Sequence, residues 1–199
     1  MKLLLHACCA DCSLKFLEVA QAIKSRFDNR DTSLVNIYYY NPNIHPRAEY
    51  TARLKAMQQV AAEKGVKIII PDWKPREYFE KIKPTLPSLE EGRQKNTERP
   101  GRCVKCWNLR LEATAKFAAE NGYDTFSSTL VTSDYQDQEK IEKIAVNMAK
   151  KYKIKFWKPK KIDNDLKTSG FYKQFFCGCV YSMKERYEEK YKSTPNPLL

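Results

Sequence analysis

The sequence lacks any apolar stretch long enough to cross a membrane. Apolar runs such as Leu3–Leu5 and Ile68–Ile70 have the length of a buried strand, whereas a transmembrane helix needs about 20 residues. The apolar stretch near the start of the sequence is too short to form a signal peptide, since polar residues follow it at once. No repeat or low-complexity tract divides the 199 residues. We therefore expect a soluble, cytoplasmic protein without a membrane partner, folded as one domain over residues 1–192 with a flexible tail at 193–199.

Cysteine is absent outside three short groups. The first group is Cys8-Cys9-x-x-Cys12, the second is Cys103-x-x-Cys106 and the third is Cys177-x-Cys179. Structural disulfides are typical of small secreted domains, which this chain does not resemble. Structural zinc is the stronger alternative, but zinc fingers gather their ligands on short turns and rarely leave surplus thiols. The grouping predicts a metal ion or an iron–sulfur cluster, with up to three thiols left for a second metal or for redox chemistry.

Acidic residues are outnumbered, with 24 Asp and Glu against 36 Lys and Arg, which gives a formal net charge of +12. This imbalance favours an acidic partner such as nucleic acid, although a lysine-rich surface can also serve solubility alone. The basic residues are interleaved with 12 Tyr, 9 Phe and 3 Trp. Aromatic rings beside cationic groups offer stacking surfaces for exposed bases, so the composition favours nucleic-acid binding.

Strand-like and helical segments alternate along the chain. Strands are expected at 3–7, 34–40, 66–70, 125–131 and 154–157, and helices from residue 13 and over 47–64, 104–121, 138–152 and 171–192. A proline-rich excursion covers about 71–101. This order predicts an α/β fold with a parallel sheet, right-handed crossovers and helices on both faces.

Such a fold gives each cysteine group a location. The first group falls where the first strand ends and the first helix begins, at the sheet edge that binds ligands in folds of this kind. A glycine- and serine-rich phosphate loop is missing at that turn, so we expect no ATP there. The second group is expected at the start of a helix, where free backbone N–H groups lower thiol pKa values. In the third group, Gly178 lets the backbone bend closely around an inorganic core.

Four motifs resemble those of a known family. They are His6-Ala7-Cys8-Cys9-Ala10-Asp11-Cys12-Ser13, Asn41-Pro42-Asn43-Ile44-His45-Pro46, Gly101-Arg102-Cys103-Val104-Lys105-Cys106-Trp107-Asn108-Leu109-Arg110 and Phe176-Cys177-Gly178-Cys179-Val180-Tyr181-Ser182. Together they resemble the QueH type of epoxyqueuosine reductase over about residues 3–183. The resemblance implies a HUP-like (adenine nucleotide alpha-hydrolase-like), Rossmann-type fold. It also implies reduction of epoxyqueuosine to queuosine at the wobble base of tRNAs with a GUN anticodon, the last step of queuosine biosynthesis.

The same resemblance implies the cofactors. They are a 4Fe–4S cluster and a second, mononuclear iron, without cobalamin and with an external electron donor. The expected metal ligands are Cys8, Cys9, Asp11, Cys12, Cys103, Cys106, Cys177 and Cys179. Asp11 stands where the family more often has proline, and it could be a ligand or only the polar start of a helix. Asp134 likewise replaces a proline in the string Ser133–Gln136.

Roles can be assigned to individual side chains. Catalytic roles are expected for Cys8, Asp11 and Cys12, around an iron with an open position for the epoxide oxygen. Substrate contacts are expected from His45, Arg102, Arg110, Tyr135 and Gln136.

Other assignments stay open between a functional and a structural role. His6 is either a proton donor or a hydrogen-bonded core residue. Arg47, Arg53, Arg102 and Arg110 either contact phosphate or cofactor or form surface salt bridges, and Tyr172, Phe175 and Phe176 either stack on a base or belong to the core. Two other functions also remain open, an iron–sulfur tRNA thiolation or desulfidation enzyme and a zinc-stabilised RNA-binding module.

Overall fold

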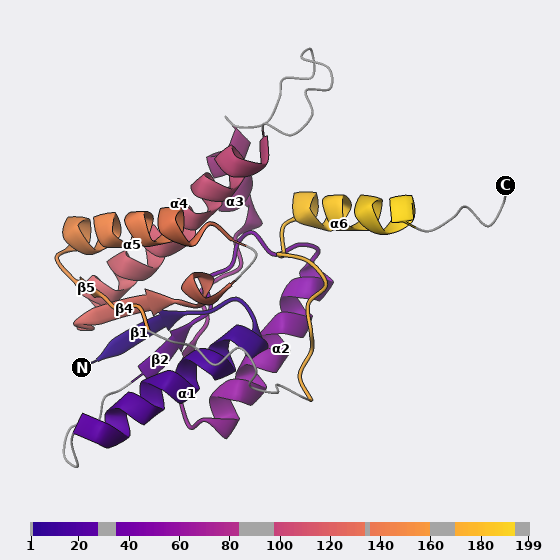
Figure 1. The fold of residues 1–199 in the computed structure, drawn as a ribbon. Coiled ribbons are helices and arrows are strands. Elements are labelled where there is room, and N and C mark those ends of the chain that lie inside the picture. The colour runs from indigo at the N-terminus through magenta and orange to yellow at the C-terminus, as the bar shows by residue number, and fades with distance from the viewer. Residues whose placement is uncertain (1, 28–34, 84–97, 134–135, 160–169, 194–199) are drawn as a thin grey trace, which may run out of the picture.

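Five parallel strands form the centre of the fold (Figure 1). The strands are β1 (Leu3–His6), β2 (Val35–Tyr38), β3 (Ile68–Ile69), β4 (Thr125–Ser128) and β5 (Lys155–Phe156), hydrogen-bonded in the order β3-β2-β1-β4-β5. In the register, Leu3 pairs with Val35 on one side and with Thr125 on the other. This computed structural model describes residues 2–27, 35–83, 98–133, 136–159 and 170–193. The predicted parallel α/β sheet of the Rossmann type is confirmed.

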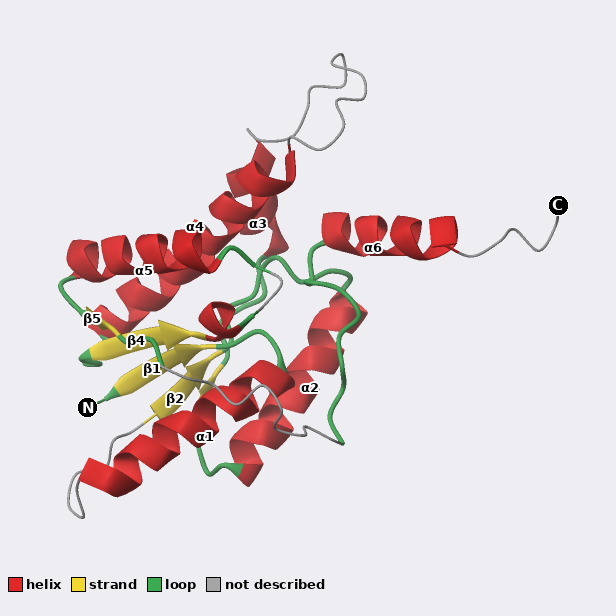
Figure 2. Ribbon diagram, in the orientation of Figure 1, coloured by secondary structure: helices red, strands yellow, loops and turns green. Residues whose placement is uncertain are grey.

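Helices cover both faces of the sheet, as Figure 2 shows. Helices α1 (Ala10–Phe27) and α2 (Arg47–Glu63) cover one face, and α4 (Glu98–Glu120) and α5 (Gln138–Tyr152) cover the other. Because side chains alternate along a strand, Leu3 and Leu5 pack with the first pair of helices and Leu4 with the second. All three leucines are fully buried, so β1 is the common spine of both apolar layers.

Three shorter elements complete the described chain. They are α3 (Pro75–Ile82), the 3₁₀ turn η2 (Thr129–Thr132) and α6 (Val180–Ser193). Helix α3 is the ordered part of the predicted proline-rich excursion, whose residues 84–97 lie outside the described residues, as does the tail from 194. Among the helices described here, none has the length and apolar character that a membrane crossing requires.

Several boundaries differ from the sequence prediction. Helix α4 begins at Glu98 rather than near Val104, since a proline such as Pro100 is tolerated in the first helical turn. The fourth strand ends at Ser128 instead of residue 131, because the Ser128 hydroxyl accepts a hydrogen bond from the Leu130 N–H and starts η2. The last helix begins at Val180 rather than at residue 171, because the chain before it bends at a glycine.

Candidate metal centre

The three cysteine groups approach one another at the carboxyl edge of the sheet. The first group spans the β1–α1 turn, the second lies on α4, and the third directly precedes α6. Cys106 of the second group and Cys179 of the third are buried in one cluster with Tyr78 and Ile82 of α3. All seven cysteines are free thiols, so the disulfide alternative is wrong for this structure.

Arg110 is the charge that links the three groups. This α4 side chain is only 1% exposed. Its guanidinium interacts electrostatically with one thiol of each group, those of Cys106, Cys8 and Cys177. Burial by itself would lower the pKa of Arg110, but the thiols, Cys106 first, hold it above its usual value. A buried cation therefore lies beside thiols of all three groups.

Hydrogen bonds between thiols set the protonation of the first group. The bond from the Cys9 thiol lowers the pKa of Cys12, and the same bond to Cys12 raises the pKa of Cys9 to about 12. The pKa of Cys8 is raised well above its usual value, first by its hydrogen bond with Cys9 and then by burial. Cys12 is therefore the thiol of this group that ionises first, with Cys9 as its proton-bearing partner.

The second group lies deeper in its helix than the sequence predicts. Because α4 begins at Glu98, Cys103 and Cys106 follow the first turn, whose free N–H groups could have lowered their pKa values. Burial instead raises the pKa of Cys106 to about 11. The predicted activation by a helix start is wrong for this pair. Its i, i+3 spacing does put both thiols on one face, and Arg110 Nη1 lies 3.9 Å from the Cys106 sulfur.

The bend in the third group needs its glycine. Gly178 has φ of +126°, a conformation that other residues rarely adopt. An added Cβ would lie 3.1 Å from Ile44 Cγ1 and 3.3 Å from Arg53 Nη1. The Gly178 carbonyl accepts a hydrogen bond from the His45 N–H at 2.8 Å. The backbone at Gly178 thus lies close to the loop between β2 and α2. Its predicted bend around an inorganic core stays a prediction.

A helix N-terminus does meet a thiol in the third group. Cys179 is the residue before α6, and its sulfur accepts a hydrogen bond from the Ser182 backbone N–H at 3.3 Å. The N-terminal N–H groups of a helix favour negative charge. A cysteine at a helix start, predicted for the second group, is therefore found in the third group at Cys179. The reason is that α4 begins before its predicted start and α6 begins after its own.

A buried histidine orients Arg110. His6 is fully buried, and its Nε2 lies 3.3 Å from Arg110 Nε and 3.2 Å from the Tyr40 carbonyl. Since a guanidinium can only donate, the tautomer with a bare Nε2 accepts from Arg110 and leaves Nδ1–H to donate to Ser128 Oγ at 2.8 Å. Burial, followed by the charge of Arg110, lowers the pKa of His6 well below its usual value. His6 is therefore a neutral, hydrogen-bonded core residue.

Several buried polar atoms at this edge have no hydrogen-bond partner. They are Arg110 Nη2, Arg102 Nε, Asp11 Oδ1, Asn41 Oδ1 and Asn43 Oδ1. A buried unpaired donor or charge costs free energy unless a ligand or counter-ion satisfies it.

The donors of this edge fit a thiolate-ligated iron–sulfur cluster. Such a cluster carries negative charge and sulfides that accept hydrogen bonds, which suits the unpartnered Arg110 nitrogen beside the thiols. Within the ranges that the structure describes, no three His, Cys, Asp or Glu side chains are grouped tightly enough to hold a metal ion. The fit therefore rests on donor chemistry.

The predicted substrate residues lie around the thiols in different ways. Gln136 Nε2 lies 4.0 Å from the Cys177 sulfur. The ring of His45 donates from Nδ1 to the Asn43 carbonyl at 2.7 Å, and its Nε2 is buried without a partner. Tyr135 lies outside the described residues. Substrate binding by these side chains stays a prediction.

Two of the arginines predicted to contact phosphate or cofactor are buried in the protein, and such a contact stays a prediction for both. Arg102, 4% exposed, donates from Nη2 to Glu185 Oε1 at 2.6 Å. Arg53, 2% exposed, pairs with Glu49 and reaches the third cysteine group. The surface salt bridges considered for them are therefore wrong. The missed signal is the i, i+4 spacing of Glu49 and Arg53, which continues to the buried Met57 and so places both charges on the inner face of α2.

Comparisons with known proteins identify the family. The family described as "Epoxyqueuosine reductase QueH" matches residues 3–185. The chain is 34% identical over 193 residues to the epoxyqueuosine reductase QueH of Dehalococcoides mccartyi, with 94% of each chain covered. It is 33% identical over 193 residues to that of Histophilus somni, covering 92% of this chain and 73% of the relative. Among solved structures, the U34-tRNA thiolase NcsA from Methanococcus maripaludis, with its [4Fe-4S] cluster, matches at a TM-score of 0.47 and 17% identity, covering 100% of this chain and 60% of the other.

Proposed function

We propose a cluster-dependent reduction for this chain, which belongs to the family of the epoxyqueuosine reductase QueH. Its members are oxidoreductases that convert epoxyqueuosine to queuosine in tRNA. The observation that carries the cofactor assignment is the meeting of three cysteine groups around the buried Arg110, one of whose nitrogens has no partner. Four of the seven thiols would hold a 4Fe–4S cluster, which supplies electrons one at a time when bound.

A second iron is the proposed use of the surplus ligands. Three thiols remain once four have bound a cluster, and Asp11 Oδ1 is buried without a hydrogen-bond partner. An unpartnered carboxylate oxygen beside Cys12, the thiol that ionises first, suits a metal ligand better than a plain helix start. We assign Cys8 or Cys12 with Asp11 to this iron, and the second group with members of the first and third groups to the cluster.

The chain's own residues prepare the site for reduction. Converting an epoxide to an alkene breaks both carbon–oxygen bonds and consumes two electrons and two protons, releasing water. Arg110 places a fixed positive charge beside the thiols, where negative charge builds up during reduction. His6 and Ser128 hold that guanidinium in place and do not themselves carry charge. The protons and electrons come from solvent and an external donor, without cobalamin.

The substrate would enter at the exposed side of the third group. Cys177 is exposed, whereas Cys106 and Cys179 are buried. Gln136 lies next to Cys177, and His45 is half-buried on the loop that holds Gly178. A wobble base of a GUN anticodon turned out of the loop could reach this side, and the net charge of +12 favours the tRNA backbone.

The test is an anaerobic assay on protein reconstituted with iron and sulfide. Wild-type protein is incubated with a chemical reductant and with tRNA bearing epoxyqueuosine, and the nucleosides are analysed by mass. Loss of one oxygen mass, with more than four irons per chain, is the expected result. A colourless zinc protein would overturn the cluster, and an intact cluster with unchanged substrate would favour the thiolation alternative. Four irons or fewer would exclude the second iron.

A further inference from the structure

We propose that Arg53 is a positioning residue that clamps the C-terminal arm, residues 170–193, and so brings Cys177 and Cys179 to the other thiols. The arm carries two of the seven cysteines and ends in α6. Figure 1 shows α6, in yellow, extending away from the sheet rather than covering it. The arm therefore needs specific anchors, and the inference concerns which side chains supply them.

Arg53 donates hydrogen bonds to the backbone of the arm. Its Nη2 donates to the Phe176 carbonyl at 2.8 Å and its Nη1 to the Cys177 carbonyl at 3.2 Å. Its guanidinium also lies over the Phe176 ring, 5.5 Å from the centroid. Arg53 thus makes three contacts with Phe176 and Cys177, at the start of the third cysteine group. The position of Cys177 therefore depends on that of Arg53.

A carboxylate on the same helix fixes the arginine. Arg53 Nε donates to Glu49 Oε1 at 2.7 Å, and Glu49 is itself buried. The other oxygen of Glu49 accepts a hydrogen bond from the hydroxyl of Tyr172, which belongs to the arm. Glu49 and Arg53 therefore hold the arm at two points. A planar guanidinium can make all of these bonds at once, which a lysine ammonium cannot.

Two further contacts place the arm against other elements. The Gly178 carbonyl accepts from the His45 N–H at 2.8 Å, and a Cβ added at Gly178 would lie only 3.3 Å from Arg53 Nη1. Arg102 of α4 pairs with Glu185 of α6. The arm is thus docked from α2 and from α4, which are the elements beside the first and second groups. Docking of the arm therefore also brings Cys177 and Cys179 toward the thiols of the other two groups.

The predicted effects on metal loading rest on the proposed metal centre, whereas the effect of Arg53 on the arm does not. Because coupling between two equilibria is reciprocal, a clamp that favours ligand assembly must itself be favoured by bound metal. Losing Arg53 should loosen the arm and lower metal loading, and removing metal should loosen the arm of the wild-type protein. The first effect on the arm does not depend on any metal.

The experiment is limited trypsin digestion of the arm, which contains Lys173 and Lys184. In metal-free protein, Arg53→Ala should speed cleavage at Lys173 about tenfold, the loss expected for hydrogen bonds to a charged donor. Arg53→Lys should give an intermediate rate. The matched control is Arg47→Ala, on the same helix, whose guanidinium lies over Trp73; it should cleave like wild type. Far-UV circular dichroism would verify that each variant is folded.

The second measurement is iron per chain after anaerobic reconstitution. Arg53→Lys should bind less iron than Arg47→Ala, and wild-type protein should be cleaved more slowly with iron than without. Folded Arg53 variants with wild-type cleavage at Lys173 would overturn the clamp. Faster cleavage with unchanged iron would overturn its role in ligand positioning. Wild-type protein that takes up no iron would instead refute the proposed metal centre, while the metal-free digestion still decides the clamp.

Discussion

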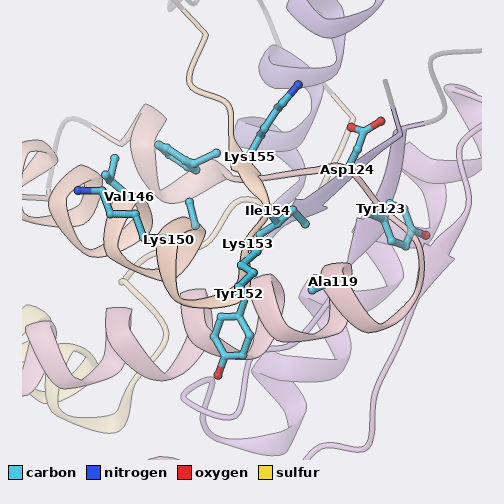
Figure 3. Close-up of a pocket in the computed structure, with 11 residues that line it drawn as sticks. Ala119, Tyr123, Asp124, Val146, Lys150, Tyr152, Lys153, Ile154 and Lys155 are labelled. Atoms are coloured by element: carbon cyan, nitrogen blue, oxygen red, sulfur yellow. The ribbon is translucent and has the colours of Figure 1, made fainter.

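The carboxyl edge of the sheet and the pocket at its amino edge differ in how their polar atoms are paired. At the carboxyl edge, Arg110, Asp11 and Asn41 each carry a buried polar atom without a partner. At the amino edge, the ends of α4 and α5 frame a pocket of about 780 Å³ with β4 and β5, shown in Figure 3. Among its described lining residues, none has a buried polar atom without a partner. Asp124 of this pocket, an exposed residue, accepts from the Lys2 N–H at 3.0 Å and from Thr125 Oγ1 at 2.7 Å.

This difference separates structural from functional polarity. No described residue around the pocket has a buried polar atom without a partner, whereas several buried polar atoms at the carboxyl edge are left for a ligand to satisfy. Asn36 Oδ1, buried in the sheet, also has no partner. The pocket at the amino edge has Lys150, Lys153 and Lys155 on its wall, but no thiol lines it. The thiols and the unpartnered polar atoms beside them, rather than this hollow, therefore mark the candidate site.

The largest expected effect tests the unpaired charge at the carboxyl edge. Arg110→Met replaces a buried cation by an apolar side chain of similar length. In metal-free protein the free energy of unfolding should stay the same or rise, because replacing a buried charge by an apolar group is often neutral or stabilising. With iron and sulfide bound, the counter-charge is missing, and the stabilisation by metal should fall by about 2 kcal/mol or more.

Denaturant unfolding under anaerobic conditions, with and without iron and sulfide, measures both quantities. Arg110→Met should reduce the stabilisation gained on binding iron and sulfide and should change the free energy of unfolding of the metal-free protein little. A large loss of stability in metal-free Arg110→Met, with the difference unchanged, would mean that Arg110 is only a structural cation and that the carboxyl edge is not poised for an anionic ligand.

Much of the fold follows from the sequence because its signals are local. A continuous apolar run, Leu3–Leu5, defines β1, whose two faces are buried by different helices, and the strand–helix order predicts a parallel sheet. The start of α4 could not be read, because Pro100 looks like a helix breaker yet is accepted in a first turn. The helix predicted from residue 171 begins only at Val180, because the chain before it bends at Gly178. Tyr172 and Phe175, considered as base-stacking or core residues, are 41% and 45% exposed.

The candidate site was predictable as a set of residue types and not as a geometry. Cysteine spacing and the strand-end position of the first group bring the thiols to one edge. The roles of the arginines depend on contacts between segments far apart in sequence, such as Arg53 with Cys177 and Arg110 with His6. The i, i+4 spacing of Glu49 and Arg53 can predict that both are buried on α2. It does not predict which segment the buried arginine contacts.

An intermediate effect is expected from a completed hydrogen bond at the amino edge. Asn36 of β2, 4% exposed, donates from Nδ2 to the hydroxyl of Tyr123 at 2.7 Å. Tyr123→Phe would leave this buried donor unsatisfied and should lower the free energy of unfolding by about 1–2 kcal/mol. Tyr152→Phe is the matched control, since that hydroxyl bonds a partly exposed carboxylate of Glu112. Both variants should bind as much iron as wild type; a loss of iron in Tyr123→Phe would show that the two edges are coupled.

The smallest effect is expected at a partly exposed ion pair beside the pocket. The hydrogen bond from Lys151 lowers the pKa of Glu112, whose side chain is 30% exposed. A carboxyl group whose pKa is lower in the folded state stabilises the fold above its unfolded pKa of about 4.3 and loses that contribution as the pH falls through its folded value. Glu112→Gln should therefore cost about 0.5 kcal/mol in urea unfolding at pH 7, and the difference from wild type should shrink below pH 4.

High salt should reduce the same difference, because it screens an exposed pair more than a buried one. At each pH at which the protein is folded, Glu112→Gln should bind as much iron as wild-type protein. If Glu112→Gln instead removed several kcal/mol, the amino edge would depend on an electrostatic contact as strongly as the carboxyl edge depends on its buried arginines. The contrast between a completed edge and an open one would then no longer account for where the ligand binds.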